Sequence, residues 1–201
     1  MEPRIKKSDD RRVRKTRKVL KESLATLLLE KNINSITVQE LVKLAGINRS
    51  TFYLHYRDIK DMLSQIEAEM IEELEEISKR YPPSLGKNPH NPYIAALLQY
   101  IWENRTFCKM LLGPFGDMAF VEQLKKLVAQ KRFSYLMDNC PDNKLQDYQY
   151  CVAFTVAGCI GLIQTWIECG MEKSPQELAQ VAEVMIQNGI DFLQRGNPAQ
   201  Q

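Results

Sequence analysis

The chain has 201 residues, 44% of them hydrophobic, and a formal net charge of +2, so it can hold one long or two short domains with a sizeable core. Five cysteines without a Cys-x-x-Cys pair favour reduced thiols in a cytoplasm over a disulfide framework. The two histidines, His55 and His90, have no neighbouring cysteine pair, so no metal site is expected. No apolar run follows the basic N-terminus, and the apolar stretch around 152–163 is short for a bilayer, so we expect neither a secretory signal nor a membrane partner.

Charge is distributed unevenly along the chain. Residues 1–60 carry 15 Lys or Arg and 7 Asp or Glu, a net +8, whereas the remainder carries 12 and 18, a net −6. The densest basic run, 4–21, overlaps the first predicted helix, at about 10–31. A basic arm and helix favour contacts with nucleic-acid phosphates. The alternative interpretation of this basic run is an N-terminal leader whose charges are simply solvated.

Two short helices joined by a tight turn are predicted over residues 37–56. Thr37 can cap the first helix, and Glu40 can close a capping box. Gly46 ends that helix and Asn48 can cap the second. The apolar face of the first helix is formed by Val38, Leu41, Val42 and Ala45. This pattern is typical of a helix-turn-helix, although a solvated helical hairpin in a larger bundle has the same spacing.

The second of these helices has two different sides. Phe52 and Tyr56 are four residues apart and should face inward. Arg49, Ser50 and Tyr53 point elsewhere, and a guanidinium, a hydroxyl and a phenol suit base edges and phosphates. The sequence therefore predicts a surface that enters the DNA major groove.

Residues 36–63 resemble the DNA-binding domain of the TetR/AcrR family of bacterial transcriptional regulators. The similarity is carried by Ala45-Gly46, Thr51-Phe52-Tyr53, Tyr56 and Leu63. It is close over about 10–65 and extends by length and helical pattern over the rest. The resemblance implies an all-helical homodimer that binds a palindromic double-stranded operator, usually represses, and releases DNA when a small molecule binds the C-terminal domain.

The predicted DNA contacts combine the residue pattern with this resemblance. Arg49, Ser50 and Tyr53 would read the groove, and the backbone would be held by Thr37, Gln39, His55 and Lys60. The family often places a phosphate-binding lysine where Ile59 stands here. Lys60 follows it but points about 100° away, and Arg57 and His55 are alternative phosphate partners.

An all-α chain is predicted, with a helix-turn-helix DNA-binding domain at 1–60 and a helical ligand-binding and dimerisation domain at 61–201. Asp58 can cap a fourth helix that ends near Arg80, before a proline-rich linker at 82–92. Further helices are expected at about 93–103, 105–112, 118–138, 144–169 and 175–195, the last starting with a Ser174–Glu177 capping box.

The last two helices, about 144–195, are heavily apolar. They suit a four-helix bundle formed by two protomers, which would be the homodimer interface. The alternative is that they close the core of a single chain.

An unknown small-molecule effector is expected to bind the C-terminal helices. The candidate pocket residues are Trp102, Phe107, Phe120, Gln164 and Trp166, for which ordinary core packing is the alternative. We find no catalytic motif and expect no cofactor and no enzyme activity. Two further hypotheses are a co-regulator that acts through a protein partner instead of an operator, and a helical-bundle enzyme, which the scarcity of histidine disfavours.

Overall fold

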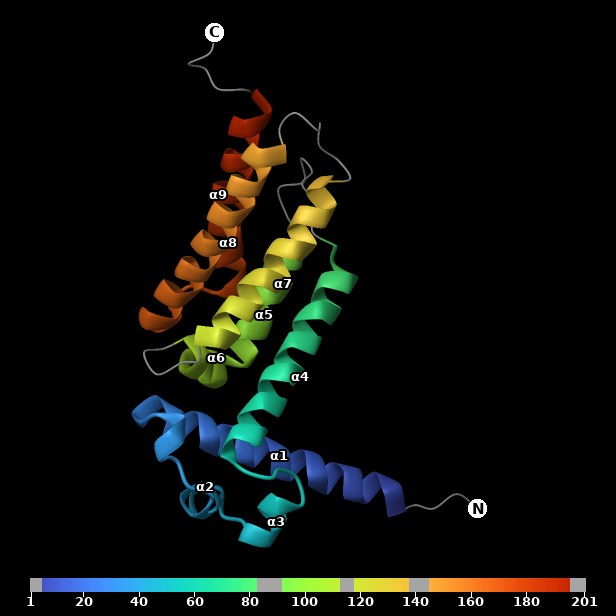
Figure 1. Cartoon of the computed structure of the whole chain (residues 1–201), viewed down its shortest axis with the longest axis vertical. Helices are drawn as coiled ribbons and strands as arrows, with labels where there is room; N and C mark the ends of the chain where they lie inside the picture. The colour runs from blue at the N-terminus through green and yellow to red at the C-terminus, as the bar shows by residue number, and fades with distance from the viewer. Residues whose placement is uncertain (1–4, 83–91, 113–117, 138–144, 196–201) are drawn as a thin grey trace. The chain divides into compact units, whose positions relative to one another are not determined.

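The computed structural model describes residues 5–82, 92–112, 118–137 and 145–195, with side chains for 11–82, 92–112, 118–129 and 149–188. Within these ranges all regular structure is helical (Figure 1). The elements are α1 (Ile5–Glu30), the 3-10 turn η1 (Ile33–Ser35), α2 (Val38–Ala45), α3 (Arg49–Tyr53), α4 (Ile59–Arg80), α5 (Pro92–Glu103), α6 (Arg105–Leu112), α7 (Met118–Met137), α8 (Leu145–Glu168) and α9 (Pro175–Arg195). The all-α prediction is confirmed, and the main difference is that α1 begins about one turn earlier than expected. Most of the predicted linker lies outside the described residues.

The chain separates into two compact units. The first contains Met1–Met70 and Thr106–Asp117, and the second contains Ile71–Arg105 and Met118–Gln201. Helix α4 contributes its first half to the first unit and its second half to the second. Helix α6 packs in the first unit, although α4 and α5 separate it from that unit in sequence. These units are defined by contacts between residues and not by function. The predicted boundary at residue 60, between a DNA-binding domain and a ligand-binding and dimerisation domain, therefore stays a proposal.

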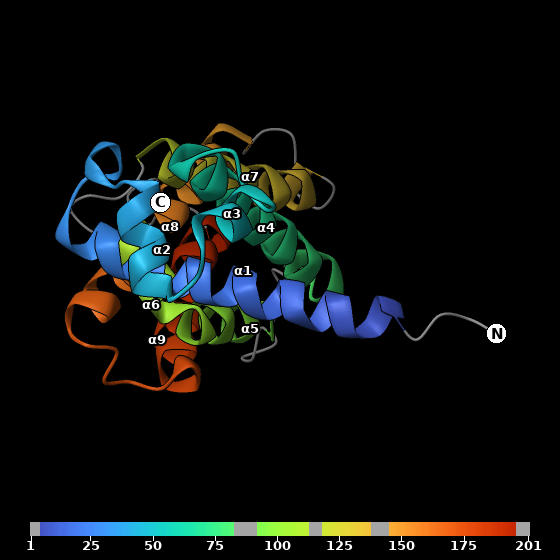
Figure 2. The same cartoon turned by 90° about the horizontal axis from the view of Figure 1, so that it is seen from below.

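The core of the first unit joins α1, α2, α3, α4 and α6. Helix α2 packs against both α1 and α3 (Figure 2). The largest fully buried side chains of this unit are Leu20, Leu24, Leu41, Phe52, Met62, Ile66 and Leu111. Because each helix contributes at least one of them, the short helices α2 and α3 are held by side-chain packing against longer helices.

In the second unit α9 packs against α5 and α8, and α8 also packs against α7. Trp102 of α5 and Trp166 of α8 stack with ring centroids 6.0 Å apart and an interplanar angle of 25°. The indole N–H of Trp166 donates to the carbonyl of Lys173 at 2.9 Å, which fixes the loop between α8 and α9 to this stack.

Helix α8 is the helix predicted to be apolar nearly all round. Val152, Val156 and Ile163 are buried, whereas Tyr150 and Phe154 are exposed on another side. Gln149–Glu168 is long and apolar enough to cross a bilayer, and 33% of its most apolar window is buried in the structure. The expectation that the apolar stretch is too short to span a bilayer was therefore wrong, because the apolar helical segment extends beyond residues 152–163. Length and composition alone do not separate a membrane span from a helix that packs against other helices.

The capping box at the start of α9 is formed as predicted. The N–H of Glu177 donates to Ser174 Oγ at 3.2 Å, and the N–H of Ser174 donates to the Glu177 carboxylate at 2.8 Å. The hydroxyl of Ser174 also donates to this carboxylate at 2.7 Å. These bonds from Ser174 lower the pKa of Glu177 from its usual value.

Replacing Ser174 with alanine should lower the free energy of unfolding by about 1 kcal/mol, because the first turn of α9 loses its cap. Since the folded pKa of Glu177 is lowered, the contribution of the pair is present above the unfolded pKa and is lost as pH falls through the folded pKa. Thermal unfolding followed by circular dichroism at neutral and acidic pH measures both effects. Ser64→Ala, at an exposed site within α4, is the control and should leave the melting temperature nearly unchanged. Equal losses in the two variants would contradict the cap assignment.

Candidate nucleic-acid interface

Helices α2 and α3 form the predicted helix-turn-helix. The hydroxyl of Thr37 accepts the N–H of Glu40 at 3.2 Å, and Gly46 ends α2 with a φ of 65°, a left-handed conformation that glycine adopts without strain. Two details differ from the prediction. The carboxylate of Glu40 pairs with Lys31, so the capping box is only half formed. Asn48 occupies the cap position of α3, but its side chain makes no cap bond.

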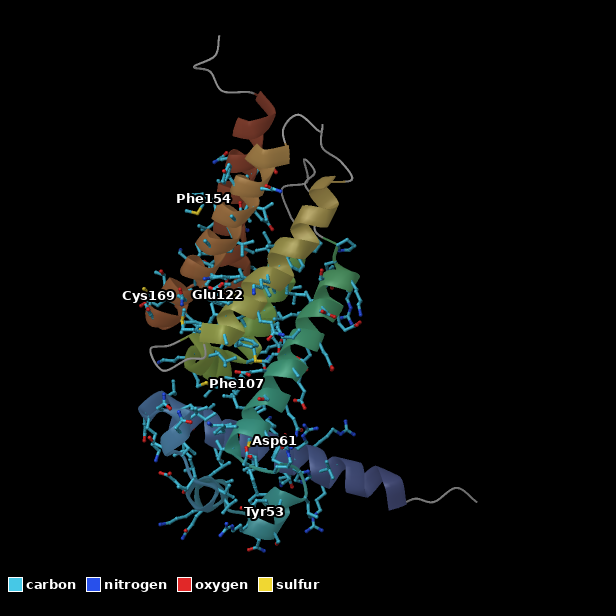
Figure 3. The ribbon with its side chains drawn as sticks, in the orientation of Figure 1. Tyr53, Asp61, Phe107, Glu122, Phe154 and Cys169 are labelled. Atoms are coloured by element: carbon cyan, nitrogen blue, oxygen red, sulfur yellow. The ribbon has the colours of Figure 1, made fainter. Side chains whose placement is uncertain are left out.

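The exposed side of α3 carries the three predicted groove-reading residues. Arg49, Ser50 and Tyr53 are all exposed, and Tyr53 retains 48% of its accessible surface. Figure 3 labels Tyr53 on α3. Arg49 Nη2 donates to the hydroxyl of Tyr53 at 3.1 Å, and the guanidinium carbon lies 5.5 Å from the centre of the Tyr53 ring. The two side chains therefore restrain each other before any ligand arrives, which lowers the entropy cost of ordering them on binding. On the inward side Phe52 and Tyr56 are buried, as predicted.

The residues predicted to contact phosphates lie in the same unit as α3. Thr37, Gln39 and Lys60 are exposed. His55 is half-buried, and burial, followed by the charge of Arg17, lowers its pKa. Its imidazole is therefore mostly uncharged at neutral pH, so it can donate a hydrogen bond to a phosphate but adds little positive charge.

Position 59 is a core position in this chain. Ile59 keeps only 6% of its surface exposed, whereas Lys60 beside it is exposed. Arg57, the other candidate, is exposed but pairs with Asp61 at 3.3 Å. A phosphate contact at the start of α4 would therefore come from Lys60, or from Arg57 after it releases Asp61.

Arg17 has a role that its place in the basic run does not reveal. Its Nε donates to the hydroxyl of Tyr56 at 3.1 Å, and its Nη2 donates to Glu69 at 2.6 Å and to Gln65 at 3.4 Å. The bond to Tyr56 raises the pKa of the guanidinium, which stays charged. One side chain thus ties α1 to the residues after α3 and to α4. A sequence signal existed: Arg17 lies three residues before Leu20, on the apolar face of α1.

The predicted pocket residues do not form a single cluster within one unit. Trp102 and Trp166 stack on each other in the second unit, where Phe120 is buried and Gln164 is half-buried. Phe107 belongs to the first unit, where it is buried and the Lys21 ammonium lies 5.1 Å from its ring centre. Phe107 therefore packs as a core residue of that unit, and a ligand role for all five residues stays a prediction.

Comparison with known proteins places the chain in a family. The family model TetR_C_8, described as a transcriptional regulator C-terminal region, matches residues 89–188. This chain belongs to the TetR family of transcriptional regulators. Because the match covers the C-terminal half, it extends the similarity beyond the helix-turn-helix motif. Membership also confirms the prediction of a transcriptional regulator.

Similar proteins include an uncharacterized HTH-type transcriptional regulator, YuxN, of Bacillus subtilis. It is 25% identical over 195 residues, which cover 89% of this chain and 63% of YuxN, so the chain spans less than two thirds of that relative. A TetR transcriptional regulator from Streptococcus agalactiae 2603V superposes with a TM-score of 0.57 at 19% identity, over 89% of this chain and 97% of that one. The fatty acid degradation regulator FadR of Bacillus halodurans superposes with a TM-score of 0.65 at 11% sequence identity, over 87% of this chain and 96% of that one. These two structures share the fold of the TetR-family chain.

Replacing Arg17 with methionine should lower the free energy of unfolding by about 1 kcal/mol, because two helices lose a charge-assisted bond that is partly screened by solvent. Denaturant unfolding measures this loss. Arg12→Met removes a positive charge from an exposed position of the same helix and should cost much less. If both variants are equally stable, the contacts of Arg17 do not hold the first unit together.

Proposed function

We propose that this TetR-family chain is a cytoplasmic homodimeric repressor that binds a palindromic DNA operator and releases it when a small molecule binds the C-terminal helices. The observation that carries the proposal is the outward, mutually bonded pair of Arg49 and Tyr53 on α3. Both side chains are exposed while the other side of the same five-residue helix is buried.

The chemistry of this surface fits double-stranded DNA. A guanidinium can donate two parallel hydrogen bonds to guanine in the major groove, and hydroxyl groups can bond to bases or phosphates. Thr37, Gln39, His55 and Lys60 would fix the position of the helix on the sugar-phosphate backbone. The net charge of +8 on residues 1–60 supports binding through counterion release.

A second copy of the chain is the proposed partner of α8 and α9. Phe154 of α8 is exposed (Figure 3). Tyr150 of α8 and Val184 and Met185 of α9 are also exposed, and α8 packs against α9. Gly158, one turn beyond Phe154, is also exposed, and a Cβ added there would meet no atom within 4 Å. An apolar surface that includes a small residue suits close packing against the same surface of a second copy. A two-fold dimer would present two copies of α3 to successive major grooves, about 34–36 Å apart.

The proposed effector would act on the spacing of the two reading helices. Trp102, Phe120, Gln164 and Trp166 are the residues we propose to contact it in the second unit. Helix α4 is continuous and contributes residues to both units, so it offers a connection along the chain from the second unit, where the effector would bind, to α3. A ligand that binds one arrangement of α4 more tightly would shift the dimer toward that arrangement and away from the operator.

The alternative function is a co-regulator that binds a protein partner and not an operator. The burial of Ile59, where the family often has a phosphate-binding lysine, supports it. Salt dependence separates the two functions. Operator binding predicts an affinity that falls steeply and linearly with salt on logarithmic axes, together with a defined footprint on the DNA upstream of the gene.

Replacing Arg49 with alanine should weaken operator binding by about 1–3 kcal/mol, because one base pair loses its hydrogen-bond donor. Fluorescence anisotropy with a duplex selected by the protein from a random library measures the loss. Lys126→Ala, at an exposed site on α7, removes the same charge far from α3 in sequence and should have little effect. Equal losses on selected and random duplexes would show that Arg49 contributes charge alone and reads no base.

Replacing Phe154 with glutamate should convert the dimer to a monomer, because a charge would be buried in the proposed interface. Sedimentation velocity measures the change. Met118→Glu alters another exposed apolar side chain, at the start of α7, and should leave the dimer intact. A wild-type chain that sediments as a monomer, or a dimer unaffected by Phe154→Glu, would contradict the proposed interface.

A further inference from the structure

The exposed side of α3 contains a second row of side chains beside Arg49 and Tyr53. Ser50 and Leu54 are four residues apart, and Leu54 keeps helical backbone angles of −71° and −21°, so the two side chains lie about 40° apart around the helix axis. Both are exposed, and Leu54 retains 81% of its surface. The proposed reading surface thus ends in a large apolar side chain that is in water in the free protein.

We propose that Leu54 determines sequence specificity by contacting the C5-methyl group of thymine in the major groove. The inference rests on the proposed function and adds a base preference to it. Thymine is the base that presents a methyl group in that groove, and apolar side chains recognise it by contact. Burying Leu54 against this methyl group removes apolar surface of both partners from water.

The same side chain discriminates against other bases. Leucine has no hydrogen-bond donor or acceptor, so it cannot replace the water bound to a base edge that it covers. A cytosine amino group beneath Leu54 would lose its solvent without gaining a partner, which is unfavourable. Leu54 therefore favours thymine both by attraction to the methyl group and by the cost of covering a polar edge.

Single exposed leucines are common on protein surfaces, and this chain has others. Leu44 and Leu29 of the first unit are 51% and 40% exposed. Leu54 differs from them in its position on α3, since its neighbours on the exposed side are Ser50 and the bonded pair of Arg49 and Tyr53. These polar neighbours do not extend Leu54 into an apolar patch of the kind that a protein partner would cover, whereas a DNA groove offers both polar edges and methyl groups.

Uracil substitution tests this inference because it removes only the methyl group. The full-length protein first selects a duplex from a random library, and each thymidine of the selected sequence is then replaced in turn by deoxyuridine. For the wild type, at least one replacement should weaken binding about threefold to fivefold, which is the effect of one buried methyl-sized group. Leu54→Ala should bind the unmodified duplex more weakly and should lose its sensitivity to that replacement.

Leu29→Ala is the matched control, since it shortens a partly exposed leucine of the same unit on α1 and should keep the wild-type response to uracil. Leu54→Gln is a second variant with a side chain of similar length, and it should show the same insensitivity as Leu54→Ala. The circular dichroism and melting temperature of each variant establish that it is folded. The inference is overturned if no thymine replacement weakens binding, or if Leu54→Ala keeps the full response to uracil. In either case, binding of the wild type to the selected duplex would leave the proposed function standing. Failure to select any duplex would instead remove the proposed function and, with it, this inference.

Discussion

Helix α3 has five residues, and a helix of that length does not persist in water by its own hydrogen bonds. Its conformation depends on the burial of Phe52 and Tyr56 against the longer helices of the first unit. Arg17 adds a directional constraint, because its bond to the Tyr56 hydroxyl and its pairing with Glu69 connect α1 to the segment after α3 and to α4. The orientation of every proposed groove-reading side chain follows from these inward contacts.

This arrangement divides the basic residues between two tasks. Arg17 faces inward and is neutralised by Glu69, so it supports the shape of the first unit. Arg49 faces outward and is held by the uncharged Tyr53 hydroxyl, so its charge remains available to a nucleic acid. A count of positive charges describes the attraction of the whole segment to DNA but does not separate these two tasks.

The second unit is organised by the same physical rule applied to longer helices. Helix α8 buries Val152, Val156 and Ile163 within its own chain and leaves Phe154 exposed on another side. The stack of Trp102 on Trp166 and the bond from Trp166 to Lys173 fix α5, α8 and the loop before α9. A firmly held helix with an exposed apolar side is suited to packing against a second protomer, which would place two copies of α3 in one assembly.

The sequence by itself determined the elements that depend on local interactions. Apolar periodicity, the Gly46 turn, the Ser174 capping box and prolines near helix ends predicted the helices and the inward side of α3, and the residues around Tyr53 were sufficient to recognise the family. Only the tertiary structure decided the bonding partners of Arg17, the place of α6 in the first unit and the assignment of Phe107 to a different unit from the stacked tryptophans. These features arise from contacts between residues far apart in sequence, such as Arg17 and Glu69, which are 52 positions apart. Periodicity reports which side of a helix is buried, but it does not report which distant side chain lies against it.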